Sequence, residues 1–195
     1  MTEVRIATLV EGDGEVQALP VLIRRIVRDI DPSIEVVLPR PFRHPSGSIR
    51  KSGGLERAIN AIAVRSPHHA ILVLTDSDDD CPKDLGPELL RRAKAARPDL
   101  RVSVVLPHRE FECWFLAAAE SLAGKRALNQ NLTAPENPEQ IRDAKGWLTA
   151  ELTRPGRYSP TQDQAAFCAL LDLKLARTRS RSFRKLWREV ERYCL

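Results

Sequence analysis

Four short, continuously apolar runs constrain the fold of this chain more than any other feature of its sequence. They are rich in β-branched residues and cover positions 4–10, 34–38, 70–74 and 102–106. Such runs are typical of strands buried on both faces, because a strand with one solvated face alternates apolar and polar residues. Helical patterns separate the runs. This alternation predicts an α/β fold, with a mostly parallel four-stranded sheet flanked by helices through right-handed crossovers.

The helical patterns also indicate how the chain is divided. Apolar residues at three- and four-residue spacing predict helices over 16–30, 55–64 and 85–96, and after the last strand over 110–123, 138–152, 162–176 and 180–193. A chain of 195 residues is long enough for one real core but too short for two full enzyme domains. We therefore expect an α/β domain over residues 1–122, with a helical, basic extension over 123–195 packed on it as a single compact unit.

Composition excludes several classes of protein. No apolar run approaches the length of a membrane span, and the first residues lack the pattern of a signal peptide. The four cysteines form no C-x-x-C pair, which argues against a disulfide framework or a zinc knuckle, so we expect a reduced, cytoplasmic protein. His68 and His69 precede a strand and are expected in a loop rather than as ligands.

Acidic residues follow three of the predicted strands. Glu11 closes the first strand, with Glu15 four residues later; residues 76–80 close the third as DSDDD; Glu110 and Glu112 follow the fourth. In open parallel sheets, ligands bind beyond the carboxyl ends of the strands. If the first and third strands are neighbours, these carboxylates converge, and their repulsion calls for a cation. All-oxygen sites suit Mg²⁺ or Mn²⁺, and the number of acids is enough for one or two ions.

The same residues are compatible with other motifs to different degrees. The G-D-G of residues 12–14 begins like a dinucleotide fingerprint, but Gln17 replaces the third glycine and Glu11 would repel a pyrophosphate. No phosphate-binding loop of the G-x-x-x-x-G-K-[ST] type occurs. A strand followed by D-x-D is also found in phosphatases and nucleotide-sugar transferases, and the aspartate run could be a solvated loop.

Two motifs resemble those of Toprim domains. The stretch VEGDGE (10–15) and the later DSD (76–78) are similar to the Toprim pairing of a glutamate after the first strand with D-x-D after a later one. Toprim domains serve topoisomerases, primases, recombination proteins and the overcoming-lysogenization-defect (OLD) nucleases, and the E-G-x-x-E spacing is most similar to the OLD type. The segments REFECWFLAA (109–118) and RSRSFRKLWREVE (179–191) resemble the bacterial Toprim-like family called domain of unknown function 4276.

The resemblance implies a Toprim (Rossmann-like) fold with a helical C-terminal extension and a metal-dependent phosphodiester site. By position, Glu11 is implied to be the general base or metal-bridging acid, and Asp76 and Asp78 to ligate the first ion. Glu15 and Glu112 are our candidates for a second ion, ahead of Asp80 and Glu110. The resemblance also implies association with an ATPase and a role in defence against foreign DNA.

A phosphodiester site also needs positive charge, and the end of the chain supplies it. Between Lys174 and Arg192 eight basic residues face two acidic ones, which makes the stretch attractive to polyanions or simply a solvated helix face. The candidates are Lys174 for catalysis and a phosphate-binding group at the start of the last helix, where Ser180 and Ser182 can also act as caps. That group comprises Arg179, Ser180, Arg181, Ser182 and Arg184.

These expectations lead to a Mg²⁺- or Mn²⁺-dependent nuclease that hydrolyses DNA phosphodiester bonds, with DNA held mainly through its phosphates. Two other hypotheses stay open. One is a regulatory subunit that binds metal or nucleic acid while an ATPase partner provides the activity. The other is a primase-like nucleotidyl transferase.

Overall fold

A parallel sheet forms the centre of the computed structural model, which describes residues 3–45, 47–65 and 70–195. The strand order is β2-β1-β4-β5, with β3 also paired to β1, and every pairing is parallel. The strands are β1 (Glu3–Val10), β2 (Glu35–Val37), β3 (Phe42–Arg43), β4 (Ala70–Leu74) and β5 (Arg101–Val105). The four predicted strands are confirmed. The two-residue β3 was not predicted, because it lies in residues 40–54, a basic loop that contains no apolar run.

The register aligns the carboxyl ends of the three central strands. Leu9 of β1 pairs with Val73 of β4, and Val73 in turn pairs with Val104 of β5. The segments that leave β1, β4 and β5 therefore begin at the same edge of the sheet. This edge is the place where the sequence predicted that the carboxylates would meet.

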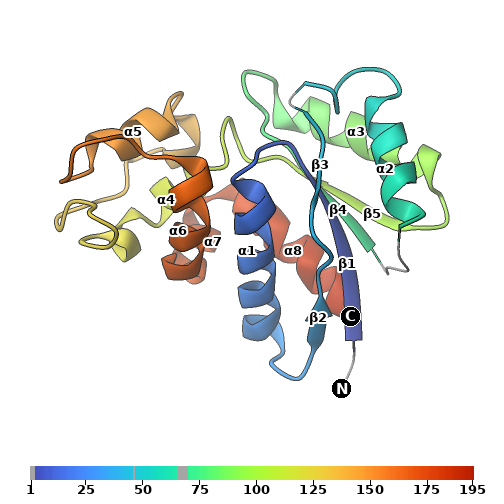
Figure 1. Ribbon diagram of the computed structural model, residues 1–195, viewed down its shortest axis with the longest axis horizontal. Helices are drawn as coiled ribbons and strands as arrows, with labels where there is room; N and C mark the ends of the chain where they lie inside the picture. The colour runs from blue at the N-terminus through green and yellow to red at the C-terminus, as the bar shows by residue number, and fades with distance from the viewer. Residues whose placement is uncertain (1–2, 46, 66–69) are drawn as a thin grey trace.

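Two pairs of helices cover the sheet (Figure 1). Helices α1 (Glu15–Ile30) and α8 (Arg181–Cys194) share one hydrophobic cluster with Ile6 and Leu72. Helices α2 (Gly54–Ala63) and α3 (Pro82–Ala96) share the other cluster with Leu9 and Val73. Neighbouring strand residues thus point to opposite buried faces, which explains why the strands read as continuous apolar runs.

Helix α8 completes the core on the face that α1 covers only in part. It contacts α1, β1 and β5, and its Phe183, Leu186 and Val190 are fully buried. The last helix therefore packs on the sheet itself, in a position where doubly wound folds need a second covering helix. The division of the chain at residues 122 and 123 stays a prediction.

The segment between β5 and α8 is more broken than its periodicity indicated. The predicted helices over 138–152 and 162–176 are wrong as continuous elements, because new helices begin after Asp143 and Asp172, whose carboxylates cap them. The predicted helix over 110–123 is a short α-helix followed by a 3₁₀ turn. The elements are α4 (Cys113–Ala117), η1 (Ala119–Leu122), η2 (Pro138–Gln140), α5 (Ala144–Ala150), the π-turn η3 (Pro160–Gln164), α6 (Ala165–Leu170) and α7 (Leu173–Arg179).

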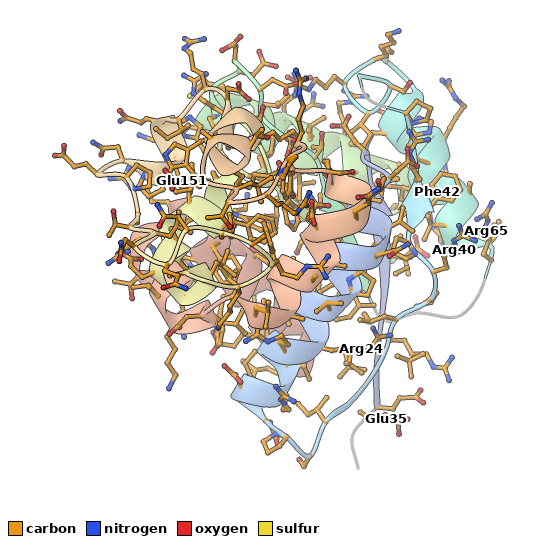
Figure 2. The ribbon with its side chains drawn as sticks, turned by 60° about the vertical axis from the view of Figure 1, so that its left-hand side comes forward. Arg24, Glu35, Arg40, Phe42, Arg65 and Glu151 are labelled. Atoms are coloured by element: carbon orange, nitrogen blue, oxygen red, sulfur yellow. The ribbon has the colours of Figure 1, made fainter. Side chains whose placement is uncertain are left out.

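The basic loop between β2 and α2 packs against the sheet at β3. The guanidinium of Arg65 lies 4.6 Å from the centre of the Phe42 ring, a cation–π contact at this edge of the molecule (Figure 2). His68 and His69 lie outside the described residues. The four cysteines are free, and within the described ranges no helix is both long and apolar enough to cross a membrane.

Candidate functional site

Carboxylates from three chain segments are buried at the carboxyl edge of the sheet. Glu11 follows β1, Asp76 follows β4, Glu112 precedes α4, and Glu15 begins α1. Glu11, Glu15 and Glu112 are buried, and Asp76 is half-buried. We call these four residues, Glu11, Glu15, Asp76 and Glu112, the acidic cluster. The parallel pairing of β1 with β4 accounts for their convergence.

The turn after β1 uses both of its glutamates as hydrogen-bond acceptors. The Glu15 Oε2 atom accepts from the backbone N–H groups of Glu11 and Gly12, each at 3.3 Å. The Glu11 Oε1 atom accepts from the N–H of Gly47 at 3.2 Å, which ties the basic loop to this turn. A carboxylate in the first turn of α1 is also favoured by the positive end of the helix dipole.

Gly14 is needed here for space rather than for an unusual backbone angle. It precedes α1 with ordinary helical angles, but an added Cβ would lie 2.7 Å from the carbonyl oxygen of Pro160 and 2.5 Å from Oε1 of Gln164. The start of α1 therefore packs directly on η3. Since Gln164 also contacts Glu112, this close approach joins two parts of the site.

The loops after β4 and β5 are joined by hydrogen bonds. The N–H of Asp78 donates to the carbonyl of Arg109, and the N–H of Arg109 donates to Oγ of Ser77. Asp78 and Arg109 both have positive φ, at 48° and 66°. Left-handed conformations cost energy in residues other than glycine and concentrate at functional sites. The pairing of the two loops fixes where the aspartate run begins.

Glu112 is the most deeply buried member of the acidic cluster. Its Oε1 accepts hydrogen bonds from Tyr158 at 3.0 Å and from Gln164 at 3.2 Å, while Nζ of Lys145 lies 3.0 Å from its Oε2. Lys145 also lies 3.3 Å from Oε2 of Glu110. Aromatic packing of α4 holds Glu112 in place, since Trp114 contacts Phe183 edge to face.

Lys145, Tyr158 and Gln164 were not predicted as site residues. Each lies in or beside a short element that folds back on α4, and such a return cannot be read from hydrophobic periodicity. Tyr158 and Gln164 do stand near a loop rich in Pro, Gly and Ser, but this composition alone does not indicate which residues turn inward.

Burial and mutual repulsion raise the pKa values of two carboxyl groups in the acidic cluster. Burial, with a smaller contribution from the Glu112 carboxylate, raises the pKa of Glu15 to about 7 against the opposing effect of the Gly12 hydrogen bond. Burial also raises the pKa of Asp76 well above its usual range, with added repulsion from Glu15 and Glu112. Burial alone would lower the pKa of Lys145, but the neighbouring Glu112 carboxylate raises it overall. The Lys145 ammonium lowers the pKa of Asp76, but not enough to offset burial and the neighbouring carboxylates.

Most of the chain, including the acidic cluster, matches a known sequence family. A family model described as domain of unknown function (DUF4276) matches residues 10–191. The chain belongs to this family. The match begins at the last residue of β1 and reaches into α8, so it includes the whole acidic cluster. No curated protein and no solved structure matches the chain.

The aspartate run of this DUF4276 chain is directed mainly at arginines. Arg50 lies 2.8 Å from both Asp78 and Asp80 and donates to the carbonyl of Asp76, while Asp79 pairs with Arg109 and Arg142. Of the predicted metal ligands, Asp76 is thus grouped with Glu11, Glu15 and Glu112, whereas Asp78 and Asp80 turn toward Arg50. Over the described ranges, no three Asp, Glu, His or Cys side chains are close enough to hold one metal ion as they stand.

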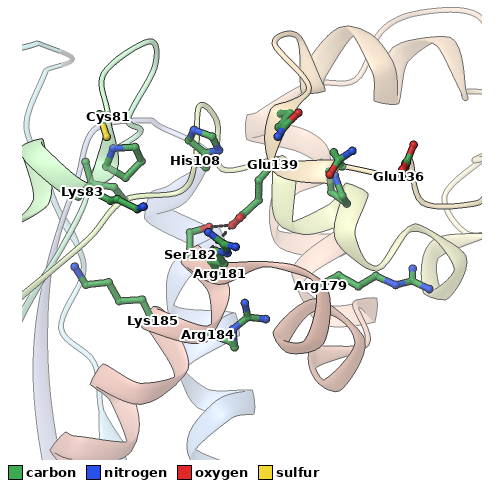
Figure 3. Close-up of a pocket in the computed structure, with 15 residues that line it drawn as sticks. Cys81, Lys83, His108, Glu136, Glu139, Arg179, Arg181, Ser182, Arg184 and Lys185 are labelled. Carbon is green, nitrogen blue, oxygen red and sulfur yellow. Dashed lines mark hydrogen bonds between the residues drawn. The ribbon is translucent and has the colours of Figure 1, made fainter.

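Most of the residues predicted to bind phosphate lie around a cavity of about 590 Å³. We call this the cationic cavity; it is bounded by the start of α3, residues 136–140 and the start of α8 (Figure 3). Arg179, Arg181, Ser182 and Arg184 line it, and Ser180 caps α8 by accepting from the N–H of Phe183. Lys83, His108 and Lys185, which were not in the predicted group, line it as well.

The start of α8 already binds a carboxylate of its own chain. Oε1 of Glu139 accepts from the Ser182 N–H at 2.9 Å and from the hydroxyls of Ser180 and Ser182, each at 2.6 Å. Burial opposes ionisation of Glu139, but these hydrogen bonds lower its pKa below the usual value. The Ser182 hydroxyl also accepts from Trp114, which connects this helix end to α4.

Lys174 lies apart from these contacts. Its side chain is exposed in the first turn of α7, and its N–H donates to the capping Asp172. The cation beside the acidic cluster is instead Lys145 from α5. The catalytic role expected for Lys174 stays a prediction.

Proposed function

We propose that this DUF4276 protein is a phosphodiesterase that hydrolyses DNA with the help of Mg²⁺ or Mn²⁺. The observation that carries the proposal is the Oδ1 atom of Asp76. This atom is enclosed beside the other carboxylates, and among the described residues no hydrogen-bond donor reaches it. A buried carboxylate oxygen without a partner is costly, so a further positive partner is expected there.

The donor set suits a hard divalent cation. Glu11, Glu15, Asp76 and Glu112 offer only oxygen atoms, which is the preference of Mg²⁺ and Mn²⁺. Asp78 would join them by rotating away from Arg50, with which it forms a partly exposed ion pair. A bound cation would remove the repulsion that raises the pKa values of Glu15 and Asp76. When bound, such an ion polarises phosphoryl oxygens and makes water a stronger nucleophile at neutral pH.

The residues of the chain have separable roles in this proposal. The Lys145 ammonium, fixed against Glu112, would stabilise the negative charge that builds up on the phosphoryl oxygens. The basic residues around the start of α8 would hold the DNA backbone. In the hydrolysis, a water oxygen bonds to phosphorus, the bond from phosphorus to the 3′ oxygen breaks, and that oxygen takes up a proton. The kinship with Toprim nucleases and the partnership with an ATPase belong to the same proposal.

A plasmid-nicking assay tests this function. Purified protein is incubated with supercoiled plasmid and Mn²⁺, and the conversion to open circles is compared with that of Asp76→Asn/Asp78→Asn. Asparagine is chosen because Asp78 has φ 48°, which asparagine tolerates better than alanine. Asp29→Asn, exposed in the last turn of α1, is the matched control. We expect cation-dependent nicking by the wild type and the control, and its loss in the double variant.

The outcomes separate the proposal from its rivals. Nicking that persists in the double variant would exclude the acidic cluster as its source. A regulatory binding role has support in the pairing of Lys145 and Arg50 with the acids, which already offsets part of the charge. Binding of Mn²⁺ in calorimetry without nicking, with or without an ATPase partner, would favour that role. Incorporation of labelled nucleotides into a primer would favour a nucleotidyl transferase.

A further inference from the structure

We infer that the cationic cavity is a phosphomonoester-binding site in which Glu139 occupies the position of the phosphate until a ligand displaces it. The site would take a nucleoside monophosphate or the 5′-phosphorylated end of a DNA strand. This inference deepens the proposed function, which has the same basic residues hold the DNA backbone, but it is tested without the acidic cluster or a divalent cation, so the two can fail separately.

The charges that line the cavity are mainly positive. Five basic side chains and His108 line it, against the carboxylates of Glu136 and Glu139. The five basic side chains come from three separate segments, because Lys83 begins α3, Arg179 ends α7, and Arg181, Arg184 and Lys185 stand in the first two turns of α8. His108 belongs to the loop after β5. A surplus of cations around a concave surface focuses a positive potential that attracts anions.

Most of these cations lack an acidic partner. Within the described part of the chain, Lys83, Arg181 and Lys185 form no ion pair, whereas Arg179 is paired with Glu120. Lys185 is half-buried, and its ammonium packs beside Gly86 of α3, where an added Cβ would lie 3.7 Å from Nζ. Burial lowers the pKa of Lys185, so its charged form gains from an added anion.

Glu139 indicates where the anion would sit. Three donors, the Ser182 N–H and the hydroxyls of Ser180 and Ser182, point to one carboxylate oxygen. Figure 3 shows Glu139 directed at Ser182. A phosphate oxygen accepts the same set of donors. Glu139 belongs to η2, a short turn of three residues on the rim, so its side chain can withdraw without disturbing a longer element. A phosphate with two negative charges would compete for these donors and would also face the unpaired Arg181 and Lys185.

The size and lining of the cavity fit an organic phosphate better than a bare ion. Pockets for small ligands have volumes of roughly 300–1,000 Å³, and this one has about 590 Å³. Pro82, Leu106 and Pro138 add apolar surface beside the charges, against which a sugar or base can pack. The shared recognition element is the phosphomonoester, and two ligands carry it.

Binding measurements with Glu139→Gln give the most specific test. Glutamine keeps an oxygen that accepts from Ser180 and Ser182 but removes the competing charge. We expect this variant to bind AMP or a 5′-phosphorylated oligonucleotide roughly tenfold more tightly in calorimetry, and Lys185→Gln to bind it roughly tenfold more weakly. Arg28→Gln, exposed on α1, is the charge-matched control and should bind like the wild type.

Comparison of the affinities for AMP and for the oligonucleotides also identifies which molecule carries the phosphate. Preference for AMP over the oligonucleotide indicates a nucleotide site, and the reverse, with loss of affinity for a 5′-hydroxyl oligonucleotide, indicates a strand end. Weaker or unchanged phosphate binding by Glu139→Gln would contradict the proposal that the Glu139 carboxylate competes with phosphate for the same donors. Absence of phosphate binding in the wild type and in Glu139→Gln, both shown to be folded by circular dichroism, would overturn the site.

Discussion

The acidic cluster and the cationic cavity begin at the same edge of the sheet but balance their charges differently. In the cavity, Glu139 is placed among hydrogen-bond donors, and its pKa is lowered despite partial burial. In the acidic cluster, Lys145 neutralises Glu112, but burial and neighbouring carboxylates keep the pKa values of Glu15 and Asp76 raised. The cationic cavity thus contains a carboxylate that its own donors stabilise, whereas the acidic cluster retains an electrostatic cost after folding.

This difference shows that burial alone does not determine the state of a carboxylate. Glu15 receives two N–H donors, yet burial, together with the charges of Glu112 and Glu11, outweighs them and raises its pKa. Around Glu139 the hydrogen bonds from Ser180 and Ser182 outweigh burial, and its pKa is lowered. Buried like charges are destabilising and persist mainly where function requires them. This contrast supports the two proposals, a divalent cation at the acidic cluster and an anion that replaces Glu139 in the cavity.

The largest expected effect is a pH dependence of stability that has opposite signs in the two regions. The pKa of Glu15 is raised from 4.5 to about 7, so between these values the folded state binds more protons than the unfolded state. Stability is then lost as the pH rises through this window, by on the order of 3 kcal/mol. In urea unfolding with EDTA, the wild type should match Glu15→Gln near pH 4.5 and be less stable than this variant at pH 8.

Glu139 provides the opposing control for that measurement. Its lowered pKa means that its stabilising contribution is present at neutral pH and is lost as the pH falls through the folded-state value. The wild type should therefore exceed Glu139→Gln in stability at pH 7, and the gap should close in acid. Parallel pH profiles for the two pairs of proteins would contradict the comparison, because they would assign both regions the same kind of charge balance.

The second effect concerns Lys145, the cation that pairs with Glu112 in the acidic cluster. Lys145→Met should lower the free energy of unfolding by about 2 kcal/mol at pH 8, because Glu112 is left buried with a charge that lacks its partner. The value is below that for a fully buried pair, since the Lys145 side chain is 40% exposed. Urea unfolding in EDTA measures this cost, and millimolar Mn²⁺ should restore much of it if a divalent ion can take the place of the ammonium.

Lys174→Met is the matched control, because Lys174 is exposed on α7 and makes no ion pair within the described structure. Its stability should change by less than about 0.5 kcal/mol. Equal losses of stability in both lysine variants would contradict a stabilising role for the pair of Lys145 with Glu112. Failure of Mn²⁺ to restore Lys145→Met would argue that the acidic cluster is neutralised by protons rather than by metal.

The sequence allowed the edge of the sheet to be predicted because short-range rules determine it. Continuous apolar runs indicate buried parallel strands, and parallel strands bring Glu11 and Asp76 to the same edge whatever the connections contain. The charge around the start of α8 was also predicted from local composition, and Ser180 is its cap as expected. Its internal anion, Glu139, was not predicted, since residues 136–140 approach α8 only in three dimensions.

The chain between β5 and α8 explains the remaining errors. Lys145 reaches Glu112 from α5, Gln164 from η3 and Tyr158 from the loop before η3. Each is separated from Glu112 by at least 33 positions in the sequence. Continuous helices over 138–152 and 162–176 were predicted from periodicity, although Asp143 and Asp172 were available as cap signals. Helical periodicity indicates which face of a segment is apolar, but it does not indicate where that segment packs.

The smallest expected effect concerns Arg50, which draws part of the aspartate run away from the acidic cluster. Its guanidinium contacts Asp78 and Asp80 at 2.8 Å, and both carboxylates are more than half exposed, at 61% and 55%. Exposed ion pairs contribute little, so Arg50→Gln should cost less than about 1 kcal/mol of stability. The same change frees Asp78 and removes a positive charge that repels an incoming cation.

Affinity for Mn²⁺ should therefore rise in Arg50→Gln while stability hardly changes. We expect a gain of about threefold to tenfold in calorimetry at low salt, which would shrink as added salt screens the charges. Arg57→Gln, exposed in the first turn of α2, is the control for a general loss of positive charge. A weaker affinity in Arg50→Gln would instead mean that Arg50 positions the Asp76 carbonyl and its carboxylate for the ion, and that the arginine belongs to the site rather than competing with it.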